Sequence, residues 1–141
     1  MHEGLVSVIM PTFNCSLHLA DSIDSILNQT YQNVELLITD DHSTDEETLS
    51  ILRRYCEQDE RVDVLFLEEN KGPGYARDHS IERARGQYIA FCDSDDRWFP
   101  EKLERQIGDK LVYIMDMVLL HILAQTNMMI IDIIHMVLLS L

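Results

Sequence analysis

The chain has 141 residues, enough for one domain with a hydrophobic core and too few for two domains of ordinary size. Eleven basic against 25 acidic residues give a net charge of −14, which argues against nucleic acid or an anionic membrane surface as the main partner. The three cysteines share no short spacing, so neither a disulfide framework nor a zinc site is expected. No segment typical of a secretion signal is present at the N-terminus, and a reduced, cytoplasmic setting is the simpler expectation.

Short apolar runs alternate with segments of helical periodicity through most of the chain. The apolar runs, which predict strands, are residues 5–10, 34–39, 62–67 and 88–92. The periodic segments, which predict helices, are residues 17–29, a segment that begins near residue 44, and residues 75–84. We expect the first strand to end at Pro11, because proline has no N–H for a ladder. The alternation predicts an α/β fold, a mostly parallel sheet with flanking helices.

The composition of the chain changes near Gly108. From residue 111 to the end, 23 of 31 residues are apolar and only Asp116 and Asp132 are charged. We therefore divide the chain into a domain part, residues 1–108, and an apolar tail, residues 109–141, which we expect to be helical.

The tail is too polar for one clean membrane-spanning helix, and two interpretations stay open. In the first, residues 111–124 and 128–141 form a helix pair that seeks the membrane or associates with another copy. In the second, which we favour, the tail is non-native sequence from a truncated or frameshifted reading frame. Either way, an exposed stretch of this apolarity promotes association.

Ligands of open parallel sheets bind beyond the carboxyl ends of the strands. An acidic cluster, Asp93-Ser-Asp-Asp96, stands at such a position directly after the fourth apolar run. Its carboxylates repel one another unless a cation or ample water compensates, and their oxygens are suitable ligands for Mg²⁺ or Mn²⁺. Asp93 and Asp95 point to the same side if strand geometry continues, so both can reach one ion or its bound diphosphate. A solvated acidic turn is the alternative interpretation.

Two further strand ends carry polar residues. Asp40 and Asp41 follow the second apolar run, where a carboxylate can accept a hydrogen bond from the imide N–H of uracil, thymine or guanine. Helix capping is the alternative for both. In the segment 70–77, glycines let the backbone approach a ligand, and Arg77 can meet a phosphate or a base carbonyl. A solvated turn is the alternative there.

Four motifs together resemble family 2 glycosyltransferases of the GT-A fold. They are VSVIMPTFN at 6–14, the segment 26–48 around LLITDDHSTDE, NKGPGYARD at 70–78 and GQYIAFCDSDDRWFPEKLE at 86–104. The resemblance covers about residues 4–107. It implies the nucleotide-sugar-binding half of an enzyme that transfers a hexose-type sugar with inversion, in polysaccharide or glycoconjugate synthesis. The implied partners are a UDP or GDP sugar donor, Mn²⁺ or Mg²⁺, and a saccharide or lipid-linked acceptor, with the enzyme cytoplasmic or peripheral to the inner face of the membrane.

Carried over residue by residue, the resemblance assigns roles at the strand ends. Pro11 and Thr12 would line the nucleoside pocket, and Asp41 would contact the base with Asp40 beside it. Arg77 would lie near the base or the diphosphate. Asp93 would point towards the ribose and Asp95 towards the metal, with Asp96 of second rank. His42 stands where the family often has a small residue such as glycine.

The resemblance leaves the catalytic base unassigned. Inverting transfer needs a general base for the acceptor hydroxyl, and in the family an acidic residue from the second half of the domain supplies it. The alternative function is therefore a nucleotide-sugar-binding remnant without turnover. A nucleotidyltransferase or a receiver-like signalling domain is disfavoured, because the first strand ends in Pro-Thr-Phe-Asn rather than in a Gly/Arg/Lys-rich loop or an acidic pair.

Overall fold

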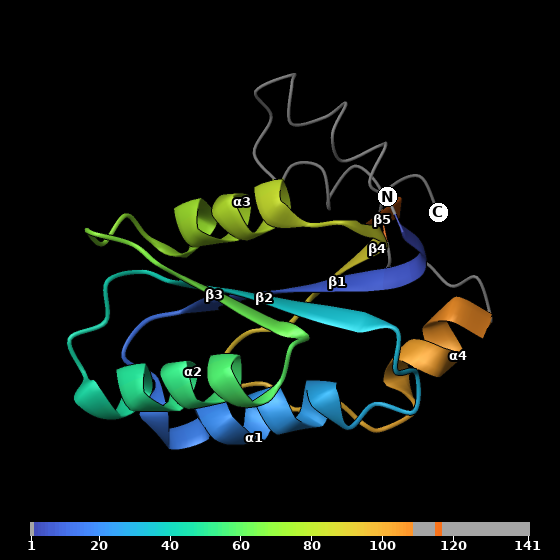
Figure 1. Cartoon of the computed structure of the whole chain (residues 1–141), viewed down its shortest axis with the longest axis horizontal. Helices are drawn as coiled ribbons and strands as arrows, with labels where there is room; N and C mark the ends of the chain where they lie inside the picture. Colours follow the sequence, from blue (N-terminus) through green and yellow to red (C-terminus); the bar gives the residue numbers. More distant parts are fainter. Residues whose placement is uncertain (1, 109–114, 117–141) are drawn as a thin grey trace.

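Within residues 2–108 and 115–116, which the computed structural model describes, one five-stranded sheet organises the chain. The elements in chain order are β1 (His2–Thr12), α1 (Ser16–Leu27), β2 (Val34–Asp40), α2 (Glu46–Gln58), β3 (Val62–Phe66), α3 (Pro73–Arg83), β4 (Gly86–Phe91), α4 (Lys102–Gly108) and β5 (Met115–Asp116). The strands lie in the order β3-β2-β1-β4-β5, with β1 to β4 parallel and β5 antiparallel to β4 (Figure 1). The predicted mostly parallel sheet with flanking helices is confirmed, and α4 is an element that no periodic segment predicted.

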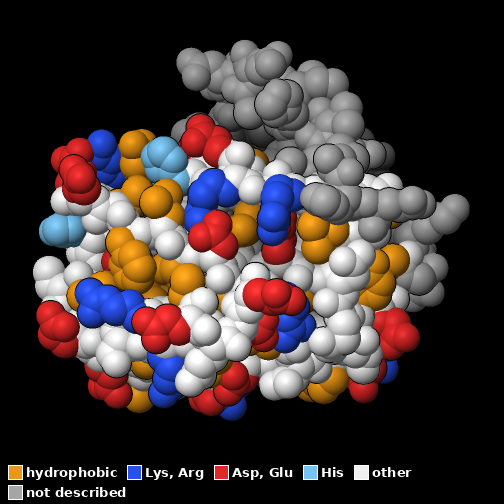
Figure 2. All heavy atoms as spheres, in the orientation of Figure 1, with side chains coloured by type: hydrophobic (Ala, Val, Ile, Leu, Met, Phe, Trp, Pro, Cys, Tyr) orange, Lys and Arg blue, Asp and Glu red, His pale blue; other side chains and the backbone are white. Residues whose placement is uncertain are grey.

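Helices cover both faces of the sheet. α1, α2 and α4 lie on one face and α3 lies on the other (Figure 1). α1 directs Leu19, Ile23 and Ile26 into the core, because positions i, i+4 and i+7 share one side of a helix, and all three are fully buried. The smaller core on the α3 face contains three buried side chains, Ile9, Leu37 and Ile89. On the face that Figure 2 shows, acidic and basic side chains of the described residues are interspersed. Since both faces are covered, the ends of the strands are where a ligand can reach the sheet.

β1 continues through Pro11 to Thr12, beyond the predicted end of the first strand. Alternate residues of a parallel strand direct their backbone groups to opposite neighbours. The Ile9 carbonyl accepts from the Cys92 N–H on the β4 side, whereas the Thr12 carbonyl accepts from the Asp41 N–H on the β2 side. Pro11 therefore faces the β4 side, where pairing has already ended. Its missing N–H costs no ladder bond, so the strand runs on.

The described part of the apolar tail is extended rather than helical. Met115 and Asp116 form β5, which pairs with the edge of β4. The predicted helix of residues 111–124 is therefore wrong at these two positions, because the open edge of β4 offers backbone groups to an extended segment. The rest of the tail predictions lie outside the described residues. In the described ranges, no helix is both long and apolar enough to cross a membrane.

A buried carboxylate joins the middle of β1 to the amino ends of β2 and β4. Glu35 of β2 is 3% exposed and accepts hydrogen bonds from Ser7 Oγ at 2.6 Å and from the Arg85 backbone N–H at 2.7 Å. The Arg85 guanidinium adds an ion pair, with Nη2 2.7 Å from the carboxylate. Burial acts to raise the pKa of Glu35, but the hydrogen bonds from Ser7 and Arg85 and the charge of Arg85 together lower that pKa.

Replacing Glu35 by glutamine should lower the free energy of unfolding by about 2 kcal/mol at pH 7, because charge-assisted hydrogen bonds are lost. The folded pKa of Glu35 lies below its ordinary value of 4.5, so its stabilising contribution is present above pH 4.5 and is lost as the pH falls through the folded pKa. Urea unfolding followed by circular dichroism, at pH 7 and at steps below 4.5, measures both effects. Glu57→Gln, an exposed position on α2, is the control. A stability difference that stays constant down to low pH would contradict the assignment.

Candidate functional site

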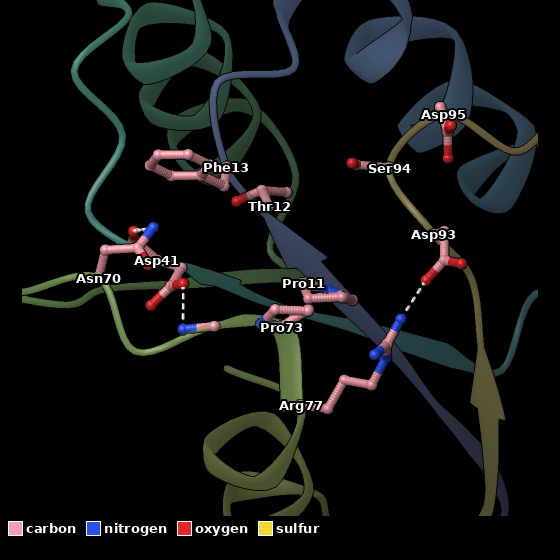
Figure 3. A pocket seen from close by; sticks show the side chains of 11 residues that line it. Pro11, Thr12, Phe13, Asp41, Asn70, Pro73, Arg77, Asp93, Ser94 and Asp95 are labelled. Carbon is pink, nitrogen blue, oxygen red and sulfur yellow. Dashed lines mark hydrogen bonds and ion pairs between the residues drawn. The ribbon is translucent and has the colours of Figure 1, made fainter. Parts of the chain in front are cut away.

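The carboxyl ends of β1, β2 and β4 and the loop before α3 surround a pocket of about 420 Å³ (Figure 3). Its lining residues are Pro11, Thr12, Phe13, Asp41, Asn70, Gly72, Pro73, Arg77, Asp93, Ser94 and Asp95. Six residues proposed from the sequence for a donor site are thus brought together, namely Pro11, Thr12, Asp41, Arg77, Asp93 and Asp95. Phe13 and Ser94 were not singled out, although each is the direct chain neighbour of a residue that was.

Two loops of the pocket wall hold each other through Asn14, which follows β1. Its backbone N–H donates to Ser43 Oγ at 2.9 Å, and its side-chain oxygen accepts from the N–H groups of Thr44 and Asp45 at 2.9 and 3.0 Å. Asn14 and His42 have φ angles of 45° and 63°, in the left-handed region that few non-glycine residues adopt. This backbone conformation accounts for the small residue that the resemblance implies at the position of His42.

Asp40 lies behind the pocket wall. It is 1% exposed and accepts hydrogen bonds from the Ser43 N–H at 2.9 Å, from Ser43 Oγ at 2.6 Å and from Thr12 Oγ1 at 3.2 Å. It is absent from the lining of the pocket, so a direct contact with a nucleotide stays a prediction, whereas its hydrogen bonds give it a bracing role. The helix-capping alternative is wrong for Asp40 and Asp41, because Asp45 caps α2.

Asp41 connects the end of β2 to the loop before α3. Its two carboxylate oxygens accept from the N–H groups of Lys71 and Gly72 at 2.8 and 2.7 Å, and its carbonyl accepts from Asn70 Nδ2 at 3.1 Å. Gly72 has a φ of 93°, which suits glycine and places its N–H on the carboxylate. Asp41 is 3% exposed yet lines the pocket. Each oxygen keeps a second lone pair with which to accept a donor from a ligand.

An ion pair crosses the opposite part of the pocket. Arg77, in the first half of α3, places Nη2 2.6 Å from Asp93 Oδ1 at the end of β4 (Figure 3). Asp93, Asp95 and Asp96 are all exposed, but Asp96 is not part of the lining. Its backbone N–H instead donates to the Asp93 carbonyl at 3.1 Å and closes a turn. Of the acidic cluster, the pocket therefore presents Asp93 and Asp95.

Asp93 and Asp95 suit a divalent cation whose coordination a bound substrate would complete. In the described ranges, no three histidine, cysteine, aspartate or glutamate side chains converge as a complete ion site. Magnesium sites that act on phosphates use one or two carboxylates, while phosphate oxygens and water complete the coordination shell, and Mn²⁺ accepts the same oxygen ligands. Asp93 and Asp95 fit that pattern by the chemistry of their donor atoms.

The cysteines near the pocket are not poised for nucleophilic chemistry. Burial is the main reason why the pKa of the Cys15 thiol is raised, although a hydrogen bond from Ser94 acts the other way. Burial likewise raises the pKa of Cys92 to about 12, with a further contribution from the neighbouring aspartates. Both side chains are thiols at neutral pH, and the thiolate is the reactive form.

Comparison with known proteins identifies the family of the chain. The model of Glycosyl transferase family 2 matches residues 7–123, a range that extends past the change of composition near Gly108. WfgD of Escherichia coli, a UDP-Glc:alpha-D-GlcNAc-diphosphoundecaprenol beta-1,3-glucosyltransferase, is 44% identical over 108 residues, which are 77% of this chain and 42% of WfgD.

Two solved structures share the fold. S. aureus TarS 1-349, in complex with UDP-GlcNAc, matches with a TM-score of 0.67 at 33% identity, over 73% of this chain and 30% of that chain. The mannosyltransferase PcManGT from Pyrobaculum calidifontis, in complex with GDP-Man and Mn²⁺, matches with a TM-score of 0.61 at 29% identity, over 66% of this chain and 28% of that chain. The chain thus spans less than half the length of each of these relatives. It belongs to glycosyltransferase family 2, and its described residues form the N-terminal part of the GT-A fold.

Proposed function

We propose that this protein provides the donor site for transfer of a hexose-type sugar from a nucleoside diphosphate to an acceptor hydroxyl, with inversion at the anomeric carbon. The observation that carries the proposal is a single pocket with a hydrogen-bond acceptor, Asp41, at one end and an arginine with two aspartates at the other. A nucleoside diphosphate has this polarity, with a base at one end and two charged phosphates at the other. The complexes of TarS with UDP-GlcNAc and of PcManGT with GDP-Man and Mn²⁺ support the same interpretation.

The Asp41 end of the pocket suits uracil or guanine. A buried carboxylate accepts hydrogen bonds, so it favours a base that presents a ring N–H. Uracil and guanine carry such a group, whereas cytosine and adenine present a ring acceptor that the carboxylate would repel. The Phe13 ring lies on the same side of the pocket as Asp41 and Asn70 (Figure 3) and offers an aromatic surface to a base.

The Arg77 end suits the diphosphate. A guanidinium binds phosphate oxygens through several N–H donors, and Arg77 can turn from Asp93 to a phosphate without leaving the pocket. When bound by Asp93 and Asp95, Mn²⁺ or Mg²⁺ would add Lewis-acid stabilisation of the negative charge that develops on the departing nucleoside diphosphate. The arginine supplies the fixed positive charge with which an otherwise acidic protein receives an anion.

The acceptor side of the reaction belongs to a part of the family fold that the described residues do not supply. A general base must remove a proton from the acceptor hydroxyl as it attacks, and the resemblance assigns that base to the second half of the domain. The name of WfgD describes an acceptor that carries a diphosphoundecaprenol, and we propose a lipid-linked or saccharide acceptor for this chain as well. We further propose that the protein acts in the cytoplasm or at the inner face of the membrane. A donor panel in a sugar-transfer assay separates the alternatives: binding with transfer supports the enzyme, and binding without transfer supports the donor-binding remnant.

Calorimetry of UDP and GDP binding, with Mn²⁺ or with EDTA, tests the cation site. We expect Mn²⁺ to tighten binding by about tenfold or more, because it offsets charge repulsion between the diphosphate and the aspartates. Asp95→Asn should remove most of this gain. Asp96→Asn, an exposed neighbour outside the pocket lining, is the matched control and should keep it. An undiminished gain in Asp95→Asn would remove Asp95 from the cation site.

Replacing Arg77 by alanine should weaken UDP or GDP binding about tenfold, the loss that corresponds to one charge-assisted hydrogen bond. Binding of the bare nucleoside should change little, because it lacks the phosphates. Arg105→Ala, an exposed arginine on α4, controls for the change in net charge. Parallel loss of nucleoside and diphosphate affinity would show that Arg77 serves the base end or the fold instead.

Replacing Asp41 by asparagine should speed amide hydrogen exchange at Lys71 and Gly72 and weaken nucleoside binding by about tenfold. The asparagine amide keeps one acceptor oxygen but turns an NH₂ group towards the second N–H. Hydrogen exchange followed by NMR measures the first effect and calorimetry the second. The control is Asp63→Asn, at an exposed aspartate of β3 that forms an ion pair with Arg83 of α3. Unchanged exchange at both amides would contradict the role of Asp41 in holding this loop.

A further inference from the structure

Two polar residues of α1 and a third just beyond its end face the segment between β4 and α4, and we call Ser22, Ser25 and Gln29 the α1 polar row. Ser22 and Gln29 are 0% and 1% exposed, and Ser25 follows Ser22 by three residues, on the same side of α1. Such positions are normally apolar, because burial of a polar group costs free energy unless the group is hydrogen-bonded. The partners of these side chains therefore show what the row does.

The side chains of the row form hydrogen bonds with backbone groups of the segment between β4 and α4 and of the first turn of α4. Ser25 Oγ accepts from the Trp98 N–H at 3.1 Å. Gln29 donates to the Phe99 carbonyl at 2.8 Å and accepts from the Leu103 N–H at 3.0 Å. The residues between β4 and α4 belong to no helix or strand, so their backbone groups need partners elsewhere. The α1 polar row supplies several of those partners and thereby fixes the path of the segment.

Ser22 acts on the part of the segment that contains the acidic cluster. Its hydroxyl donates to the Ser94 carbonyl at 2.8 Å and lies 3.1 Å from the His18 carbonyl within α1. Ser94 stands between Asp93 and Asp95 along the pocket (Figure 3). Its C=O belongs to the planar peptide unit that leads into Asp95. A hydrogen bond to that oxygen therefore restrains the direction in which the neighbouring aspartates leave the backbone.

We propose that Ser22 is a positioning residue for the donor site, and that its hydrogen bond to Ser94 sets the direction of Asp93 and Asp95 in the pocket. The inference rests on the proposed function, in which these aspartates act on the diphosphate through a cation. Ser22 is fully buried and does not line the pocket, so its effect on a ligand would be indirect. Its loss should reduce the cation-dependent part of nucleotide affinity and spare the part that the base end supplies, because Asp41 is held by a different loop.

The test measures two affinities for each variant of the full chain. Calorimetry gives the Kd of UDP or GDP, whichever the unchanged chain binds more tightly, with EDTA and with Mn²⁺. The ratio of the two Kd values is the gain from the cation. In Ser22→Ala we expect this gain to fall about fivefold, the factor that corresponds to one hydrogen bond of ordinary net strength, with the Kd in EDTA unchanged.

Ser25→Ala is the matched control, because it also removes a hydrogen bond between a serine hydroxyl of α1 and the backbone of the same segment, here one accepted from the Trp98 N–H instead of one donated to the Ser94 carbonyl. Thermal unfolding should show similar losses of stability in both variants, while the cation gain in Ser25→Ala stays within about twofold of the unchanged chain. Should Ser22→Ala fail to fold, Ser22→Cys keeps the size of the side chain with a weaker donor, and a reduced gain is again expected.

Each outcome decides the matter. An unchanged cation gain in the Ser22 variant overturns the positioning role while the proposed function stands. An equal loss in Ser25→Ala also overturns it, because the effect would then come from the stability of the segment as a whole. If the unchanged chain shows no gain from Mn²⁺, the proposed cation-assisted function fails and the positioning role falls with it.

Discussion

The pocket is held together by backbone N–H groups that donate to side-chain oxygens of a neighbouring loop. Asp41 receives the N–H groups of Lys71 and Gly72, and Asn14 receives two more from the loop after β2. Past the strand ends no ladder remains, so these groups would otherwise lack partners inside the protein. The shape of the pocket depends on a few short polar side chains, each of which holds a loop as well as lining or supporting the site.

This arrangement also decides where negative charge is tolerated. The chain carries 25 acidic and 11 basic residues, yet Asp41 is stabilised by two backbone donors and Asp93 by Arg77. Screening limits the reach of distant charges to about 8 Å at physiological salt, so the local arginine and the local carboxylates matter more to an anionic ligand than the net charge does. The acidic balance of the chain is therefore compatible with a diphosphate site.

Much of this site follows from the sequence, because the carboxyl ends of parallel strands must meet at one edge of the sheet. That rule brings Asp41 and the acidic cluster together without knowledge of any side-chain direction. It does not show that Asp40 is buried beneath Ser43, because that contact is made by a turn that passes through the left-handed His42. Helical periodicity also does not explain why a serine stands at position 22 on the apolar side of α1. Its hydrogen-bond partner, the Ser94 carbonyl, is distant in the chain. The pairing of β5 with the edge of β4 could not be predicted from the sequence either, because an apolar composition alone favours a helix as readily as a strand.

The proline at the end of β1 has a consequence for the shape of the pocket. Pairing between β1 and β4 stops at Ile9 and Phe91, while pairing between β1 and β2 continues to Thr12 and Asp40. Pro11 cannot donate a hydrogen bond towards β4, so the two strands are free to separate there. The pocket thus lies where a backbone donor is absent between two neighbouring strands, and the same proline that removes the donor supplies part of the pocket lining.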